Sequence, residues 1–169
     1  VISLLRKHNV VVSLGHSRAT LEDLDRAQEA GLNHVCHLFD TFERTSLIDG
    51  WQWVPGLLEY ILIRNELSCE IICDMFHVLP EYVKLAIKIL GPDRFVAITD
   101  SSPGAGLSPG VYKSHDGREF SNETGVCRLI SDPLIVAGSM LTMNKAFKNL
   151  VECCDVHPVM AARFTSGNP

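Results

Sequence analysis

The chain alternates short apolar runs with amphipathic segments, and this alternation limits its fold more than any other feature. Four runs rich in β-branched residues are predicted strands: residues 9–14, 34–39, 69–73 and 94–99. Predicted helices separate them: residues 20–30, 57–62 and 80–91. Repeated strand–helix units favour right-handed βαβ connections and a parallel sheet. Two architectures remain open at this point, a doubly wound sheet or part of an eight-stranded barrel.

The remainder of the chain breaks the alternation. Residues 101–132 are rich in Gly, Pro, Ser and Asp, with β-like pieces near 111–112 and 126–130. Helices are expected at about 139–152 and after His157-Pro158. No glycine-rich phosphate loop follows any predicted strand, which weakens the nucleotide-binding architecture. We therefore favour a partial TIM-like (β/α)8 barrel, with four consecutive βα units, a short β insertion and C-terminal helices.

Composition excludes several classes of function. The chain has 20 acidic and 15 basic residues and a net charge of −5, which argues against nucleic acid as a partner. No apolar run reaches the roughly 20 residues that a membrane span requires. The six cysteines show no C-x-x-C spacing, so we expect reduced thiols in a cytoplasmic protein.

Ionisable residues follow each of the four predicted strands. They are His16, His37, His77 and Asp100. The carboxyl ends of parallel strands meet at one edge of the sheet, where active sites of α/β folds lie. Imidazoles and a carboxylate gathered there suit a divalent metal ion and acid–base chemistry. His34 lies three residues before His37, so we expect it on the opposite face of its strand.

Several phrases in this order resemble the N-acetylglucosamine-6-phosphate deacetylases of the amidohydrolase superfamily. They are residues 15–20 (GHSRAT), 37–39 (HLF), 73–78 (CDMFHV), 99–100 (TD) and 137–143 (AGSMLTM). The resemblance implies a metal-dependent (β/α)8 barrel, of which residues 1–169 correspond to the C-terminal half. The first barrel half and the accessory β-domain have no counterpart in the chain. We expect this half alone to be inactive and, with open sheet edges, to associate as a homo-oligomer, most simply a dimer.

The resemblance also implies roles for particular residues. His16 and His37 match metal ligands, Asp100 matches the catalytic aspartate, and His77 matches a histidine that contacts the substrate. The remaining metal ligand of the family, a glutamate, comes from the absent half. The implied substrate-binding residues are Asp40, Thr41, Asp74, Met75, Phe76, His77, Val136, Ala137 and Gly138. The implied cofactor is zinc or another first-row divalent ion, and the implied reaction is deacetylation of an N-acetylated amino sugar.

Two positions depart from the family pattern. The family has Asn-Ala where this chain has Asp40-Thr41, and an arginine for the sugar phosphate where this chain has Trp53. Tryptophan cannot supply a charged fork to phosphate, although Arg44 lies nearby in sequence. Three readings therefore stay open: deacetylation of N-acetylglucosamine 6-phosphate, hydrolysis of another amide or an unphosphorylated sugar, and a non-catalytic sugar-binding remnant.

Overall fold

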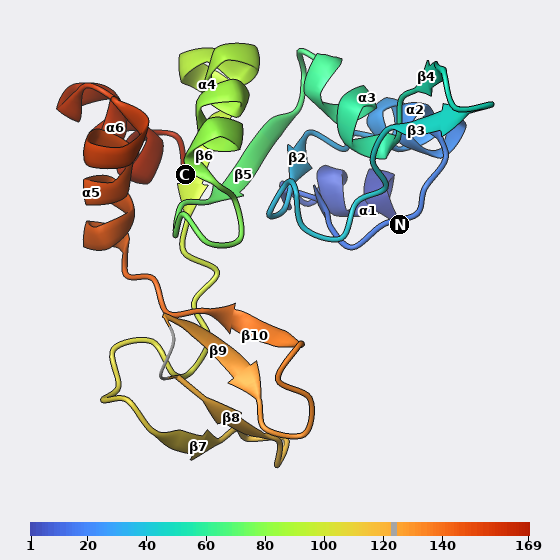
Figure 1. The fold of residues 1–169 in the computed structure, drawn as a ribbon. Helices are drawn as coiled ribbons and strands as arrows, with labels where there is room; N and C mark the ends of the chain where they lie inside the picture. The colour runs from blue at the N-terminus through green and yellow to red at the C-terminus, as the bar shows by residue number, and fades with distance from the viewer. Residues whose placement is uncertain (123–124) are drawn as a thin grey trace. The chain divides into compact units, whose positions relative to one another are not determined.

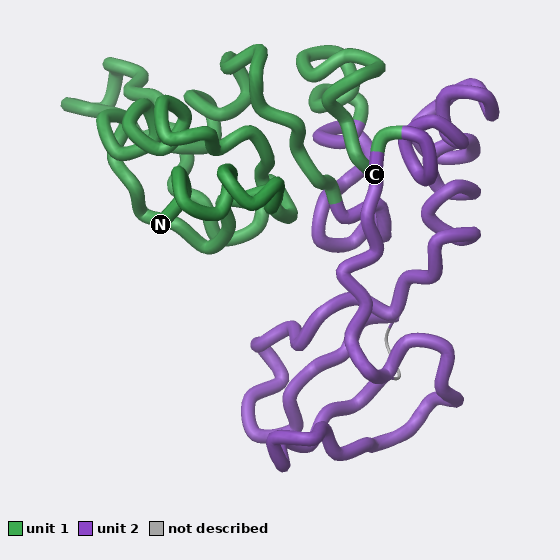
Figure 2. The backbone as a smooth tube through the Cα atoms, turned by 180° about the vertical axis from the view of Figure 1, so that it is seen from behind, with its two compact units in different colours: residues 1–71, 84–96, 168 green, residues 72–83, 97–167, 169 purple. Residues whose placement is uncertain are grey.

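The structure, a computed structural model, describes residues 1–122 and 125–169 (Figure 1). Helices and strands alternate through most of the chain, so the α/β class predicted from the sequence is confirmed. The chain divides into two compact units (Figure 2). The first contains residues 1–71, 84–96 and 168, and the second contains residues 72–83, 97–167 and 169.

The first unit is built on a short parallel sheet. Its strands β1 (Ser13–Leu14), β2 (His34–Val35), β5 (Ser68–Ile72) and β6 (Phe95–Ile98) occur in the order β1-β2-β5-β6, which is also their order in the chain. The β1–β2 and β2–β5 pairs are parallel. The last residue of β5 and the last two of β6 belong to the second unit. The sheet agrees with the predicted βαβ order, but β1 and β2 are much shorter than the apolar runs that predicted them.

Helices of the first unit begin where the sequence signals indicated. Helix α2 (Leu21–Glu29) has Thr20 as its N-cap, and the Thr20 and Asp23 side chains form a reciprocal capping box. Helix α3 (Leu57–Ile63) starts after Gly56. Helix α4 (Pro80–Arg94), of which residues 84–94 belong to this unit and 80–83 to the second, starts at Pro80 and is kinked at Gly91, where φ is 70°. The pyrrolidine ring of proline suits the first turn of a helix, where no amide hydrogen is needed.

The first unit contains two further elements that the sequence pattern did not predict. Helix α1 (Ile2–Lys7) precedes the sheet, and its six residues are all at least partly exposed. Strands β3 (Ser46–Ile48) and β4 (Gln52–Val54) form an antiparallel hairpin. The exposed fractions of Trp51 and Trp53 on this hairpin are 72% and 76%. The core of the unit is formed by Leu24, Val35, Ile61, Leu67 and Phe95 among others.

The second unit contains an antiparallel sheet and the C-terminal helices. Strands β7 (Val111–Lys113), β8 (Glu119–Ser121), β9 (Val126–Leu129) and β10 (Val136–Ser139) form a sheet in the order β10-β9-β8-β7. Helices α5 (Met143–Cys154) and α6 (Pro158–Ala162) follow and lead into a π-helical turn, η1 (Arg163–Gly167). The predicted β insertion is therefore a four-stranded sheet, and the predicted start of α5 was about four residues too early.

A buried asparagine organises the loop before β7. Asn122 is 2% exposed, and its side-chain carbonyl accepts a hydrogen bond from the Gly110 amide at 2.8 Å. Its amide nitrogen donates to the carbonyls of Gly104 and Ser108, at 3.2 and 3.0 Å. Because a buried amide is costly unless it is hydrogen-bonded, these bonds fix the loop against the sheet.

Every helix among the described residues is too short or too polar to cross a membrane. All six cysteines are present as thiols.

Candidate metal centre and neighbouring site residues

The register of β1 and β2 brings His16 and His37 to the same level. Leu14 is paired with Val35, and the Cys36 amide donates to the Leu14 carbonyl at 2.8 Å. Each histidine lies two residues beyond this pair. In adjacent parallel strands, equal offsets from a paired position lie side by side. The two strand-end histidines predicted from the sequence are therefore brought together by this pairing.

The two imidazole rings meet edge to face. Their Nε2 atoms are 3.0 Å apart, their centroids are 4.6 Å apart, and the ring planes are inclined by 72°. His37 is 7% exposed, whereas His16 is exposed. The Nδ1 atom of His37 is buried and has no hydrogen-bond partner among the residues that the structure describes. A buried imidazole nitrogen without a partner fits a position where a ligand normally binds.

Asp40 completes a cluster of potential metal ligands. One ligand atom each from His16, His37 and Asp40 lie within 4.8 Å of one another. Two imidazole nitrogens and one carboxylate oxygen are a donor set that zinc and other first-row divalent ions accept. These residues therefore fit the metal ion that the sequence implied. The resemblance implied a substrate contact for Asp40, and the geometry places its carboxylate beside the two imidazoles.

The candidate residues adopt an unusual backbone conformation. The φ angles of His16, His37 and Asp100 are 45°, 27° and 46°, in the left-handed region that non-glycine residues rarely adopt. Met75 and Thr41 also have positive φ, at 62° and 53°. Strained backbone of this kind is typically retained at ligand-binding and catalytic positions. Five of the predicted site residues therefore share a conformational signature that their sequence did not reveal.

Gly15 allows the two metal-ligand segments to approach closely. A Cβ atom at this position would lie 3.3 Å from the Cys36 Cβ and 3.9 Å from the His37 Cε1. The first contact is closer than most Cβ contacts in proteins. A side chain at position 15 would therefore press directly on the segment that carries His37.

His34 has a different environment from His37. Its Nε2 lies 3.0 Å from the Glu70 Oε1, and both side chains are mostly buried. The hydrogen bond from His34 holds the pKa of Glu70 below its usual value. This pair links β2 to β5, so His34 has a structural partner, as expected of a residue outside the metal cluster.

In the second unit, Asp74 and His77 form a hydrogen-bonded turn after β5. The Oδ1 atom of Asp74 accepts hydrogen bonds from the amides of Phe76 and His77, at 2.9 and 2.8 Å, and its Oδ2 lies 2.6 Å from the His77 Nδ1. Burial raises the pKa of Asp74, but these hydrogen bonds outweigh it, so the pKa lies below its usual value. Asp74 therefore remains ionised and orients the His77 ring through Nδ1.

Phe76 extends this turn towards β9. Its ring is 47% exposed and meets the His77 ring edge to face, with centroids 5.8 Å apart. The Arg128 guanidinium lies 5.6 Å from the Phe76 centroid, a distance suited to a cation–π contact. The Phe76 ring and the His77 imidazole, both in the segment predicted to bind substrate, thus lie next to a cation from β9.

The segment that carries Asp100 is tied to the end of β10. The Ser139 amide donates to the Asp100 carbonyl at 3.1 Å, and the Ser102 amide donates to the Ser139 carbonyl at 2.9 Å. Gly138 has φ of 94°, and a Cβ there would lie 3.1 Å from the Ser102 Cβ and 3.4 Å from the Asp100 carbonyl oxygen. The Asp100 side chain is exposed. Within the second unit, Asp100 and the predicted 136–138 segment are therefore neighbours.

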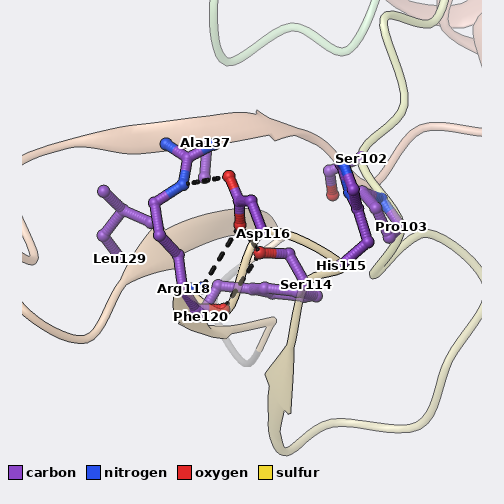
Figure 3. Close-up of a pocket in the computed structure, with 9 residues that line it drawn as sticks. All are labelled: Ser102, Pro103, Ser114, His115, Asp116, Arg118, Phe120, Leu129 and Ala137. Atoms are coloured by element: carbon purple, nitrogen blue, oxygen red, sulfur yellow. Dashed lines mark hydrogen bonds and ion pairs between the residues drawn. The ribbon is translucent and has the colours of Figure 1, made fainter.

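Residues of the second unit that the structure describes line a smaller and a larger cavity. The smaller one, of about 140 Å³, is lined by residues that include Ser102, His115, Phe120 and Ala137 (Figure 3). An ion pair between Arg118 and Asp116, with Nε and Oδ2 2.6 Å apart, lies at its edge. The larger cavity, of about 650 Å³, is open and is lined by Asp74, Lys145, Lys148 and Asn149 among others. Asp74 and Ala137, both predicted to bind substrate, thus line cavities that the sequence alone did not indicate.

Trp53 and Arg44 lie in the first unit, at positions where the sequence departed from the family pattern. Trp53 is paired with Leu47 across the β3–β4 hairpin and remains exposed. An Arg44 guanidinium nitrogen is 3.4 Å from the Phe39 carbonyl, to which it donates. The structure therefore gives Arg44 a backbone partner.

A His-His-Asp cluster at the carboxyl ends of adjacent parallel strands defines a candidate metal centre in an α/β protein. Comparisons with known proteins show which proteins this chain is similar to. The chain matches no family model. It is 30% identical over 168 residues to an N-acetylglucosamine-6-phosphate deacetylase from Bacillus subtilis, covering 99% of the chain and 40% of that protein. It is 32% identical over 165 residues to an N-acetylgalactosamine-6-phosphate deacetylase from Escherichia coli O157:H7, covering 98% and 41% respectively.

A solved structure shows the same relationship. It is a mutant N-acetyl-D-glucosamine-6-phosphate deacetylase from Mycobacterium smegmatis in complex with N-acetyl-D-glucosamine-6-phosphate. The TM-score is 0.86 at 27% identity, and the match covers 99% of this chain and 43% of that one. The chain is thus a relative of the N-acetylglucosamine-6-phosphate deacetylases, which confirms the resemblance, and it spans about 40% of the length of the curated relatives it matches.

Proposed function

We propose that this chain is part of a metal-dependent amidohydrolase that removes the acetyl group from an N-acetylated amino sugar 6-phosphate. The observation that carries the proposal is the facing pair of His16 and His37 Nε2 atoms, 3.0 Å apart, in a chain related to such deacetylases over nearly its whole length. N-acetylglucosamine 6-phosphate is the proposed substrate, because the names of several relatives specify it.

His16 and His37 are the proposed metal ligands. When bound, a zinc or other first-row divalent ion would polarise the amide carbonyl and lower the pKa of a water molecule towards about 7. The exposed His16 side chain leaves the centre accessible from solvent. The buried His37 side chain is a ligand that packing holds in place. This difference in burial suits a centre that must bind substrate without losing its ligands.

Asp100 is the proposed proton-transfer group. Hydrolysis adds water across the amide C–N bond, which yields acetate and the free amine. Asp100 would accept the proton from the attacking water and then donate it to the departing nitrogen, because an amine cannot leave as an unprotonated anion. The left-handed backbone and exposed side chain of Asp100 support this role.

The segments 74–77 and 136–138 are proposed to bind the sugar. Asp74 orients the His77 ring through Nδ1, and the oriented imidazole is proposed to hydrogen-bond the substrate. Met75, Phe76, Asp40 and Thr41 are retained as proposed substrate contacts. Val136, Ala137 and Gly138 would contact the sugar through their backbone, since Gly138 has no side chain to obstruct it.

We further propose that residues 1–169 are the C-terminal half of a (β/α)8 barrel, in a cytoplasmic protein that forms a homodimer. Four strands in sequential order support the barrel assignment, and six reduced thiols support the compartment. The match to only about 40% of the relatives' length supports a contribution from chain outside these residues. Exposed sheet edges support self-association.

A second substrate class is favoured by one observation. Trp53, 76% exposed, lies where the resemblance placed an arginine for the sugar phosphate. An unphosphorylated N-acetylated sugar would need no such charge, and aromatic rings pack well against apolar sugar faces. The alternative keeps the metal-dependent hydrolysis and changes only the specificity.

A direct assay tests both proposals. The native protein, at its natural length and loaded with Zn²⁺, is incubated with N-acetylglucosamine 6-phosphate or with N-acetylglucosamine, and the released amine is quantified. We expect kcat/KM to be at least tenfold higher for the phosphorylated sugar. The reverse preference would support the second class, and the absence of amine release from either sugar would contradict amino-sugar deacetylation.

A further inference from the structure

We propose that Asp40 is a further metal ligand, which forms with His16 and His37 a two-histidine, one-carboxylate ligand set on this chain. The inference rests on the metal dependence of the proposed function and adds metal ligation to the substrate contact proposed for Asp40.

A tight turn determines where Asp40 lies. Its amide donates to the His37 carbonyl at 3.1 Å, which closes a four-residue turn from His37 to Asp40. Left-handed φ angles at His37 and Phe39, of 27° and 80°, produce this turn. The turn brings the Asp40 carboxylate back beside His37. Ligand atoms of His16, His37 and Asp40 therefore lie within 4.8 Å of one another. A chain that left the strand in an extended conformation would carry position 40 away from the imidazoles.

The Asp40 carboxylate has no competing partner within residues 1–122 and 125–169. Its side chain makes no hydrogen bond or ion pair there, and Arg44, four residues further on, donates to a carbonyl instead. Other carboxylates with limited exposure are engaged, as Glu70 is with His34 and Asp74 with His77. A partly buried carboxylate beside two imidazoles, without a partner of its own, is available to a cation.

The donor set selects the class of ion. Imidazole nitrogen and carboxylate oxygen suit zinc and the other first-row divalent ions, and three protein ligands with an open position are characteristic of catalytic zinc. The His37 ring is fixed by burial, while His16 and Asp40 reach solvent at least partly. The centre therefore has one rigid ligand and two ligands on its accessible side, where water or substrate could occupy the remaining position.

The test uses metal affinity of the whole chain. Apo-protein is titrated with Zn²⁺ by calorimetry and with Co²⁺ by visible absorption, and the bound ion is counted by elemental analysis after dialysis. We expect about one ion per chain for the wild type. Asp40→Asn should weaken affinity by about 100-fold or more, because even partners outside the ligand shell are worth 10–100-fold.

Asp49→Asn is the matched control. Asp49 lies in the exposed turn of the β3–β4 hairpin and also has a positive φ, of 52°, so the substitution repeats the chemistry away from the cluster. We expect wild-type affinity for this variant. Circular dichroism of the apo-proteins checks that both variants keep the native fold.

A measurement on the wild type makes the test independent of the variant's folding. In protein labelled with ¹³C at aspartate carboxyl carbons, Zn²⁺ should shift one resonance in proportion to occupancy of the site, and Co²⁺ should broaden it. Binding of Zn²⁺ with no aspartate carboxyl resonance perturbed would overturn the proposal. Wild-type affinity in Asp40→Asn, or a wild-type chain that binds no ion, would also overturn it.

The deacetylase assay separates this inference from the proposed function. Amine release with unchanged metal affinity in Asp40→Asn would leave the proposed function intact and remove Asp40 from the ligand set. Asp40-dependent metal binding without any amine release would support the ligand assignment and contradict the deacetylase proposal.

Discussion

His16 Nε2 faces His37 Nε2 across 3.0 Å, at equal offsets from a paired position on two adjacent parallel strands. A neutral imidazole has one N–H and one lone pair, so two neutral rings in this arrangement make at most one hydrogen bond, and a ligand atom of Asp40 lies within 4.8 Å of theirs. A divalent cation would satisfy all three groups at once. The pair is therefore the feature from which the chemistry of the chain is best tested.

Replacement of His37 should abolish metal binding, whereas replacement of His34 should not. For His37→Gln we expect a reduction in Zn²⁺ affinity of at least about 100-fold, since a ligand is lost. His34→Gln breaks the link to Glu70, and we expect a lower free energy of unfolding, by about 1 kcal/mol, with one Zn²⁺ still bound. Calorimetric titration and urea unfolding measure the two effects, and equal metal loss in both variants would contradict the different roles assigned to these histidines.

Replacement of Asp100 should separate turnover from metal binding. Asn tolerates the left-handed backbone that this position requires, so Asp100→Asn should keep the fold. Positioned acid–base groups contribute about 10²–10⁴-fold, and we expect a fall in kcat of that size with unchanged metal content. The comparison is made in the native protein, with metal counted in the same samples. A variant that retains more than about a tenth of the wild-type rate would remove Asp100 from proton transfer.

Gly138 should be sensitive to a single added methyl group. Gly138→Ala would bring a Cβ to 3.1 Å from the Ser102 Cβ at a residue with φ of 94°, and we expect a loss of about 1–3 kcal/mol of unfolding free energy. Gly106→Ala is the control, because its φ of 80° is similar but no atom lies within 4 Å of the added Cβ. Urea unfolding followed by circular dichroism gives both values. Equal destabilisation would show that backbone conformation alone is responsible, and that the contact with the Asp100 segment contributes nothing.

The Asp74–His77 turn should make stability depend on pH below about 4. The folded pKa of Asp74 is depressed, so its contribution is fully present above its ordinary pKa near 3.8 and is lost as the pH falls through the folded value. Asp74→Asn removes charged hydrogen bonds from a mostly buried site, and we expect a cost of about 1–3 kcal/mol at pH 6. The difference between wild type and variant should shrink towards pH 3, as measured by urea unfolding at both values. A difference that stays constant or grows with acidity would contradict the direction of the pKa shift.

Thiol reactivity should follow burial rather than sequence position. Cys153 is exposed, whereas Cys69 is buried, and burial raises the pKa of the Cys69 thiol to about 12. We expect Cys153 to provide the fast phase with Ellman's reagent in the native protein, and Cys153→Ser to remove that phase. All six thiols should react in denaturant. A fast phase that persists in the variant would assign the reactive thiol elsewhere.

Local signals in the sequence predicted where α2, α3 and α4 begin, because each signal depends on neighbouring residues. Thr20 and Asp23 form their capping box, and Pro80 opens its helix as expected. The first strand was predicted too long, since Val10 and Val11 are 44% and 62% exposed and only Ser13–Leu14 pairs with another strand. An apolar run alone cannot tell which of its residues will find a partner.

The candidate site was partly predictable for a similar reason. His16 and His37 were predicted because they follow the carboxyl ends of predicted strands, and the carboxyl ends of parallel strands lie at the same edge of a sheet. The sequence did not place Asp40 in the same cluster, since that depends on left-handed φ angles at His37 and Phe39. Such angles are set by the closed turn and its surroundings, and ordinary side chains at these positions give no signal for them.

The exposed β3–β4 hairpin has a consequence for spectroscopy. The chain has two tryptophans, and both lie on this hairpin with most of their surface in water. Native emission should therefore already resemble that of a solvated indole, and global unfolding should change it little. Fluorescence of this protein is a local probe: a blue shift would report that something has covered the hairpin, even when every other element is unchanged.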